Sequence, residues 1–196
     1  MSTLTPATGV VAVVGNPRPA SRTRTAAEAV ARRVAEITGQ PLLSTIDLAD
    51  LAGELLAPAH PAADAARDRV ARAAVVVVAT PVYKASYTGL LKAFLDLYGP
   101  DGLRGTVAVP LVVSGNPAHS LAGEVHLRPV LVELGAWVPT RALALAEAQL
   151  GSLDDAVTAW SDAAAPVLRS LAAAARGTLA TDDLTSSGAA LEAARS

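Results

Sequence analysis

One short stretch of the chain combines guanidinium groups with side-chain hydroxyls. It reads GNPRPASRTRT over residues 15–25, and its candidate phosphate ligands are Arg18, Ser21, Thr23 and Thr25. Guanidinium groups and hydroxyls bind phosphate oxygens, and the start of a helix adds free backbone N–H groups and partial positive charge. The stretch therefore predicts a phosphate site. The plainer alternative is a helix cap made by Ser21, with the arginines in solvent.

The same stretch lacks the glycine patterns of the two best-known nucleotide loops. It contains no GxGxxG, and the chain contains no GxxxxGK[ST]. Both absences disfavour a Rossmann dinucleotide enzyme and a P-loop NTPase. A hydroxyl-rich loop of this kind suits the monophosphate of flavin mononucleotide (FMN).

A second stretch, TPVYKASYTGLLKAFLDL, concentrates residues that are scarce elsewhere. Both lysines and four of the six aromatic residues of the chain lie between Tyr83 and Tyr98. Pro81 fixes the backbone after an apolar run, so we expect the backbone of Val82, Tyr83 and Lys84 to follow the edge of a flat ring. Tyr83 can pack against such a ring. We interpret the leucines that follow as core residues.

A third stretch, SGNPAHSLAGEVHLRPVL, begins with a polar turn. We expect Ser114 and Gly115 to contact a flavin edge and His119 to begin the next helix. His126 follows seven residues later on about the same helix face, but two histidines at this spacing do not make a metal pair. No metal site is predicted. Lys84 and His119 are the candidates for a direct role in catalysis.

Apolar runs and helical periodicity alternate along the chain. Strands are expected over residues 9–14, 41–46, 74–79, 107–113 and 138–145. Helices are expected over residues 21–38, 62–73, 87–98, 118–134 and 153–175. Pro110 weakens the fourth strand, and Pro166 is expected to break or kink the last helix.

Strands that alternate with helices predict crossover connections and a parallel sheet covered on both faces. Five strands fit a flavodoxin-like, doubly wound α/β domain with strand order 2-1-3-4-5. Ligands of such sheets bind outside the carboxyl ends of the strands, at the switch point between the first and third strands, where the three stretches meet. We assign residues 1–176 to this domain and interpret residues 177–196, which are small and polar, as a flexible tail.

The composition excludes several classes of protein. The 196 residues include no cysteine, which excludes disulfides, thiol nucleophiles, iron–sulfur clusters and thiolate zinc sites. A net charge of −2 without a basic stripe argues against nucleic-acid binding. No apolar run is long enough to span a membrane, and the first eight residues lack a signal pattern, so we expect a cytoplasmic protein.

Taken together, the three stretches resemble the NAD(P)H-dependent FMN reductase family. The most specific part is TPVYKxxYxGxLKxxLD in the second stretch, and the resemblance covers about residues 10–145. The chain looks closest to the flavin reductase components of two-component alkanesulfonate monooxygenase systems. The first stretch matches more loosely, with Asn16 where a serine is usual.

The resemblance implies a flavodoxin-like homodimer or homotetramer that reduces FMN with NADPH or NADH and supplies reduced flavin to a monooxygenase. By position, it implies three groups of FMN-binding residues: the phosphate ligands Arg18, Ser21, Thr23 and Thr25, the ring-lining Pro81, Val82, Tyr83 and Lys84, and Ser114, Gly115 and His119, which close the site.

Family members that release reduced flavin can carry an inserted tyrosine in the helix after the fourth strand, where it forms a π-bulge at the subunit interface. This chain reads Gly123-Glu124-Val125-His126 there, without a tyrosine. His126 is the candidate to take its place.

The predicted mechanism is hydride transfer from nicotinamide C4 to flavin N5, with backbone N–H groups and Lys84 stabilising the reduced ring. Three alternatives stay open. One is a protein that retains FMN and reduces quinones, azo compounds or metal oxyanions. The others are a flavodoxin-type electron carrier, which is usually strongly acidic, and a flavin-free scaffold.

Overall fold

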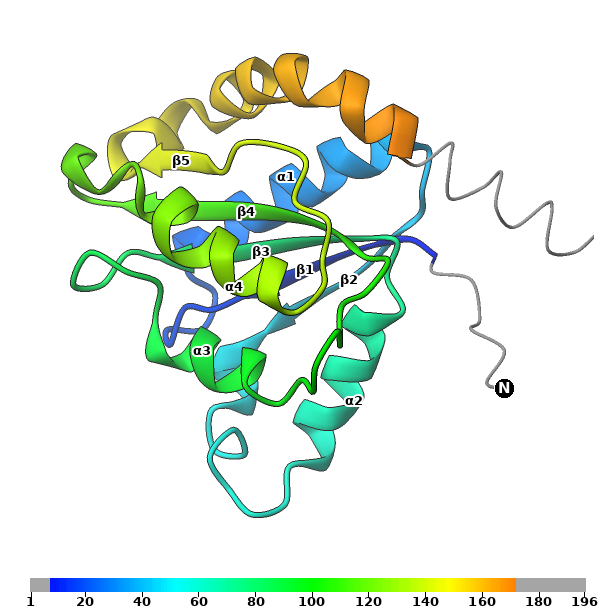
Figure 1. Cartoon of the computed structure of the whole chain (residues 1–196). Helices are drawn as coiled ribbons and strands as arrows, with labels where there is room; N and C mark the ends of the chain where they lie inside the picture. The colour runs from blue at the N-terminus through cyan, green and yellow to red at the C-terminus, as the bar shows by residue number, and fades with distance from the viewer. Residues whose placement is uncertain (1–7, 172–196) are drawn as a thin grey trace, which may run out of the picture.

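The computed structural model describes residues 8–171 and contains a five-stranded sheet (Figure 1). The strands are β1 (Val10–Val14), β2 (Leu42–Asp47), β3 (Val75–Pro81), β4 (Val107–Ser114) and β5 (Leu143–Ala146). Their order is β2-β1-β3-β4-β5, and every neighbouring pair is parallel. The predicted flavodoxin-like topology is confirmed.

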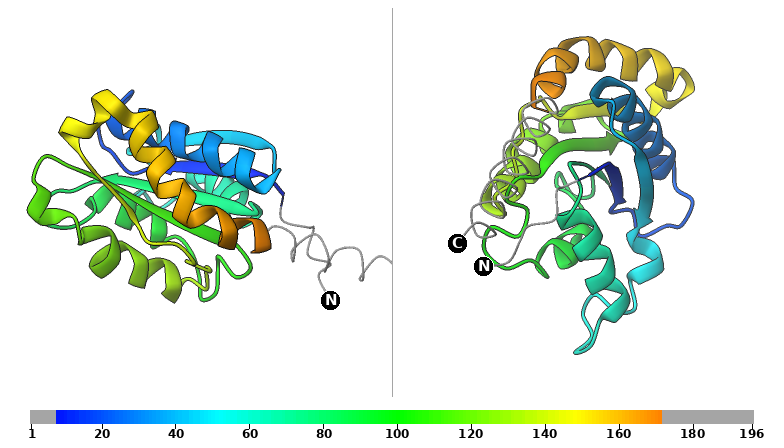
Figure 2. Two further views of the ribbon diagram at one scale, coloured as in Figure 1. Left: turned by 90° about the horizontal axis from the view of Figure 1, so that it is seen from above. Right: turned by 90° about the vertical axis from the view of Figure 1, so that its right-hand side faces the viewer.

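Helices cover both faces of the sheet. They are α1 (Arg22–Thr38), α2 (Pro61–Ala71), α3 (Gly89–Leu95) and α4 (Arg128–Glu133), with a further helix over residues 153–171. Shorter helical turns are η1 (Leu48–Leu51), η2 (Pro117–His119), the π-helical η3 (Gly123–Leu127) and η4 (Glu147–Ser152). Figure 2 shows α1 and the 153–171 helix on one side of the sheet and α2 on the other.

The three central strands explain the long apolar runs in the sequence. Every residue of β1, β3 and β4 is buried. Val10, Ala12 and Val14 belong to the core beneath α1, whereas Val11 and Val13 belong to the core beneath α2, α3 and α4. A parallel sheet with helices on both faces needs apolar side chains at every position, which is why these strands lack polar alternation.

Capping residues define the ends of α1. The Ser21 hydroxyl accepts a hydrogen bond from the N–H of Arg24 at 3.3 Å, and Gly39 adopts a left-handed φ of 64°. Both are common helix-end devices. The helix therefore matches its predicted range to within one residue, and its buried alanines and valines face the sheet.

Pro110 lies inside β4 without weakening the sheet. The N–H of Ala108 donates to the carbonyl of Trp137 at 2.7 Å, so the nitrogen of Pro110, two residues further on, faces the same side. Pairing with β5 begins only at Leu111. The missing N–H therefore costs no hydrogen bond of the sheet.

Three predictions for the carboxyl-terminal half are wrong. Residues 118–134 do not form one helix but the succession η2, η3 and α4. The last strand, predicted over 138–145, begins only at Leu143 and ends at Ala146. The final helix continues through Pro166, which is exposed, so the unpaired carbonyl one turn earlier faces water. The proposed tail at 177–196 lies outside the described residues.

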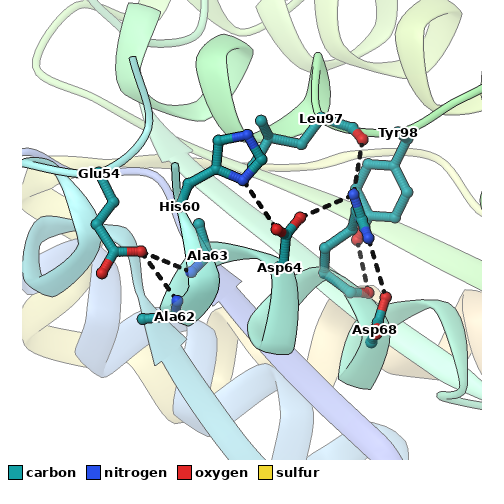
Figure 3. Close-up of polar contacts among 9 residues, drawn as sticks. Glu54, His60, Ala62, Ala63, Asp64, Asp68, Leu97 and Tyr98 are labelled. Carbon is teal, nitrogen blue, oxygen red and sulfur yellow. Dashed lines mark hydrogen bonds and ion pairs between the residues drawn. The ribbon is translucent and has the colours of Figure 1, made fainter. Parts of the chain in front are cut away.

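A polar network fixes α2 against the loops beside it (Figure 3). A carboxylate oxygen of Glu54 accepts from the N–H groups of Ala62 and Ala63, at 2.9 and 3.2 Å. The Arg67 guanidinium pairs with Asp64 at 2.9 Å and donates to the carbonyl of Leu97. Tyr98 donates its hydroxyl to the carbonyl of Arg67, and burial raises the pKa of Tyr98 above its ordinary value.

Candidate functional site

The carboxyl ends of β1, β3 and β4 lie side by side. Val14 is in register with Ala79, and Pro81 is in register with Val113. The N–H of Val82 extends this alignment by donating to the carbonyl of Val113 at 2.9 Å. The three stretches that follow these strands are therefore neighbours at the switch point of the sheet, as predicted.

Asn16 shapes the loop between β1 and α1. Its carboxamide nitrogen donates to the hydroxyl of Thr23 at 3.1 Å, and its carboxamide oxygen accepts from the N–H of Arg18 at 3.0 Å. Asn16 and Thr23 are both buried, and Ala20 adopts a left-handed φ of 50°. In the sequence, Asn16 is notable only as a departure from the family pattern. The readiness of asparagine to form side-chain-stabilised turns is the signal that could have identified its role.

The polar residues of this loop differ in whether their side chains are free to bind a ligand. Ser21 is half-buried and caps α1, but its hydroxyl proton is free to be donated. Arg18 and Thr25 are exposed, and Arg18 forms no ion pair within residues 8–171. Arg24 is already bound to Glu28. The free donors therefore lie at the start of α1, next to its unpaired N–H groups.

The second loop contains a tight hairpin. Tyr83 and Ser86 exchange two backbone hydrogen bonds, at 2.8 and 3.1 Å, around Lys84 and Ala85. Both central residues have positive φ, 51° and 66°. Two-residue hairpins of this geometry prefer Asn-Gly, so a Lys-Ala pair is strained by about 1–3 kcal/mol per residue. The turn exposes Lys84 and 42% of Tyr83 at the carboxyl edge.

Two buried threonines anchor the second loop. The Thr88 hydroxyl donates to the carbonyl of Gly15 and accepts from the N–H of Leu91, while Thr80 accepts from the N–H of Thr88. A Cβ on Gly15 would lie only 2.6 Å from the Cβ of Leu91, so the close contact requires glycine. Neither threonine was predicted as a site residue. A Thr-Gly pair before an apolar helix is a capping signal that could have identified Thr88.

The third loop begins at Ser114, which is buried. Its hydroxyl accepts from the N–H of Asn116 at 3.1 Å, and the Asn116 side chain accepts from the N–H of Ala118 at 3.0 Å. His119 is half-buried and ends η2 instead of opening a long helix. Gly115 is exposed beside the turn.

A cavity of about 240 Å³ opens beside this loop. Ser114 and His119 contribute to its lining, together with Val112, Ala144 and Gln149. These residues place it over β4 and β5, one strand away from the switch point.

A π-helical turn, η3, follows the third loop. The N–H of Arg128 donates to the carbonyl of Gly123, five residues earlier, which is the π-helical spacing. A Cβ on Gly123 would lie 2.6 Å from the Cβ of Ala142, so the turn packs too closely for a side chain there. The π-turn thus forms without a tyrosine in it, and His126 is exposed on it.

An ion pair between Glu124 and Arg128 also binds the backbone of the segment before β5. The Arg128 guanidinium donates to both carboxylate oxygens of Glu124, at 2.6 and 3.3 Å, and to the carbonyls of Val138 and Thr140. Glu124 also accepts from the N–H of Ala142 at 2.6 Å. These bonds engage backbone groups of residues 138–142, which belong to the segment predicted as a strand. The hydrogen bonds from Arg128 also lower the pKa of the Glu124 carboxyl.

The residues that the structure describes contain no group of three or more His, Asp or Glu side chains suited to a metal ion. None of their helices is long and apolar enough to cross a membrane.

Comparisons with known proteins identify the family of the chain. A model of the NADPH-dependent FMN reductase family matches residues 8–150. An FMN reductase (NADPH) of Escherichia coli (strain K12) is 45% identical over 76 residues, which cover 39% of this chain and 40% of the relative. One from Pseudomonas aeruginosa is 35% identical over 131 residues, or 62% of this chain and 67% of the relative.

The fold is also similar to a solved structure with a related description. The apo form of an NADH:FMN oxidoreductase (EMOB) superposes with a TM-score of 0.66 and 33% identity, covering 87% of this chain and 89% of that one. The sequence match to the Escherichia coli relative spans less than half of that protein. The family match, in contrast, covers most of the described chain, from β1 to η4. This chain therefore belongs to the NADPH-dependent FMN reductase family.

Proposed function

We propose that this protein reduces FMN with NADPH or NADH at the carboxyl edge of the sheet. The observation that carries the proposal is the convergence of the first and second loops. The first loop has donors that are free to bind a phosphate, and the second loop has a strained, exposed hairpin. The hydrogen bond from Thr88 to Gly15 joins the bases of these two loops. Membership of the family supports the same reaction.

The first loop fits the flavin phosphate. Arg18, Ser21 and Thr25 would donate to its oxygens, together with the unpaired N–H groups at the start of α1. Thr23 has a different role, because its side chain is buried, and its hydroxyl accepts from Asn16 and maintains the shape of the loop. Of the four predicted phosphate ligands, three are free to bind directly.

The second and third loops fit the flavin ring. Tyr83 would pack against the ring, while Pro81, Val82 and Lys84 line its edge and Ser114, Gly115 and His119 close the site. Bound FMN supplies the hydride acceptor, and NADPH or NADH supplies the hydride. Lys84 would stabilise the negative charge that reduction places on the ring, and its charge is not neutralised by an acidic partner within residues 8–171.

The finer assignments belong to the same proposal. We propose that the reduced flavin is released to a monooxygenase and that the reaction takes place in the cytoplasm, where reduced nicotinamides are supplied. We also propose a homodimer or homotetramer. Leu121 before η3, Val125 in η3 and Val132 in α4 are each more than half exposed, and a subunit contact would bury them.

The decisive experiment is a steady-state assay of NADPH and NADH oxidation with and without added FMN. We expect turnover to depend on the concentration of added FMN, because FMN acts as an exchangeable substrate. A coloured protein whose turnover does not change when FMN is added would favour the alternative, a protein that retains its FMN. No oxidation of either nicotinamide in the presence of FMN would refute the reductase activity.

A further inference from the structure

Glu147 brings a carboxylate to the phosphate-binding end of the molecule. It is the first residue of η4, directly after β5, yet its Oε2 lies 2.9 Å from Nη2 of Arg22, the first residue of α1. Its Cδ would also lie 3.8 Å from a Cβ built on Gly115. The carboxylate therefore lies between the first and third loops.

The groups around this carboxylate would also suit a phosphate. The start of α1 carries partial positive charge, and Arg18 next to it has no acidic partner within residues 8–171. Arg24 is bound by Glu28 and lies 3.6 Å from Asp47, so it is not available. Arg22 is thus the second arginine that a phosphate could use, and Glu147 already occupies it.

The ion pair is easily exchanged. The side chains of Arg22 and Glu147 are 66% and 46% exposed. Pairs this exposed contribute little to stability, because water screens the charges. A phosphate monoester, which carries nearly two negative charges at pH 7, can compete for the same guanidinium.

We propose that Glu147 is an affinity-determining residue: it competes with the FMN phosphate for Arg22 and so keeps the flavin exchangeable. The inference rests on the proposed function, specifically on a phosphate at the start of α1. It adds a residue after β5 that sets how tightly the phosphate is held. Since the competition is between charges, it concerns the phosphate and not the ring.

The test compares Glu147→Gln with the wild-type protein, using quenching of flavin fluorescence by the purified full chain. Riboflavin, which has the same ring without the phosphate, is the internal control. At low ionic strength we expect the substitution to lower the Kd for FMN about three- to tenfold while the Kd for riboflavin changes less than about twofold. The gain for FMN should shrink at about 0.5 M salt, because salt screens the charges.

Glu36→Gln is the matched control variant. Glu36 is also exposed and also pairs with an arginine of α1, Arg33, at 3.3 Å. It lies 14 residues from Arg22, or about 21 Å along the helix. We expect this variant to bind both flavins as the wild type does.

A double-mutant cycle with Arg22→Gln tests whether Glu147 changes the affinity for FMN through Arg22. If Glu147 acts by occupying Arg22, Glu147→Gln will tighten FMN binding less in the Arg22→Gln background. Equal gains in both backgrounds would overturn the competition for Arg22. An equal change for FMN and riboflavin, or no change for either, would overturn the role of Glu147. Failure of FMN to bind any variant would instead refute the proposed flavin site itself.

Discussion

Arg18 is the residue on which the phosphate assignment depends most. It is exposed at the start of α1, and its backbone N–H is fixed by Asn16 at 3.0 Å while its side chain forms no ion pair within residues 8–171. Its guanidinium can therefore reach an anion without first breaking an ion pair. Its removal therefore affects ligand binding more than folding.

We expect Arg18→Ala to weaken FMN binding about tenfold, because one charge-assisted contact is lost. Riboflavin binding and the melting temperature should change little. Fluorescence titration with both flavins measures the effect, with Arg104→Ala as the control, since Arg104 is exposed and pairs with Asp101 before β4. Equal FMN affinity for Arg18→Ala and the wild type would contradict the phosphate site.

The hairpin at Lys84 and Ala85 combines exposure with backbone strain. Residues other than glycine rarely adopt positive φ twice in succession, and both Lys84 and Ala85 are exposed. Strain of this kind persists where the neighbouring structure fixes the backbone, often at sites of function. Here Val82 is bound to Val113, and Thr88 to Gly15, on the two sides of the turn.

Ala85→Gly is expected to raise the free energy of unfolding by about 0.5–1 kcal/mol, because glycine adopts this φ without strain. Ala163→Gly, an exposed position in the 153–171 helix, should lower it by about 1 kcal/mol. Urea unfolding of both variants provides the comparison. If Ala85→Gly destabilises as much as Ala163→Gly does, the turn is not strained.

At the scale of elements, η3 and the segment before β5 form one unit. Arg128 and Glu124 together make five hydrogen bonds with each other and with the backbone at 138, 140 and 142. Gly123 packs directly on Ala142 beneath them. The π-turn is therefore held by tertiary contacts and not by the preference of its own residues.

We expect Glu124→Gln to lower the free energy of unfolding at pH 7 by about 1–3 kcal/mol, because a charged hydrogen-bonded pair is broken. The pKa of Glu124 is lowered in the folded protein, so its contribution is complete above the ordinary carboxyl pKa of about 4.3 and is lost as the pH falls below it. The difference between variant and wild type should thus narrow in acid. Glu133→Gln, exposed on α4, is the control. A difference that stays constant from pH 7 to acid would disprove this account.

These contacts also explain which elements the sequence could predict. The apolar runs of β1, β3 and β4 reflect burial on both faces, and Ser21 and Gly39 cap α1, so both signals are local. The segment at 138–142 has strand-like residues, but its backbone is bound by Arg128 and Glu124, which no local pattern reveals. The π-turn and the uninterrupted helix at Pro166 likewise depend on packing and exposure.

In the candidate site, too, local features could be predicted from the sequence and tertiary contacts could not. The three loops could be located because parallel strands bring their carboxyl ends together. Thr88 and Asn16 were not recognised, because their roles appear only once Gly15 and Thr23 are seen beside them. The left-handed turn was also unpredictable, since Lys-Ala is not a sequence that favours it.

At the scale of the whole molecule, the two sides of the sheet differ. The side with α1 is closed by the 153–171 helix, as Figure 1 shows, and its core extends from Val10 to Leu168. On the other side, η3 and α4 leave Leu121, Val125 and Val132 exposed. These residues follow the third loop, so a second subunit bound there would lie close to the proposed flavin site.

Val125→Glu is therefore expected to shift the protein from an oligomer towards a monomer, because a charge would be buried in the contact. Light scattering after size-exclusion chromatography measures the mass. Leu56→Glu, at an 89% exposed position before α2, is the control and should leave the mass unchanged. A wild-type protein that is already monomeric would exclude the proposed assembly.

The hydrogen bond between Thr88 and Gly15 has a consequence for how the site moves. It ties the base of the second loop to the end of β1, so the backbones on which the phosphate and the ring would rest are parts of one body. The hairpin beyond it is bound only at its own ends, through Tyr83 and Ser86. Amide protons of Gly15 and Leu91 should exchange slowly with solvent and that of Lys84 rapidly, which would make the tip of the hairpin the part of the second loop that moves most easily.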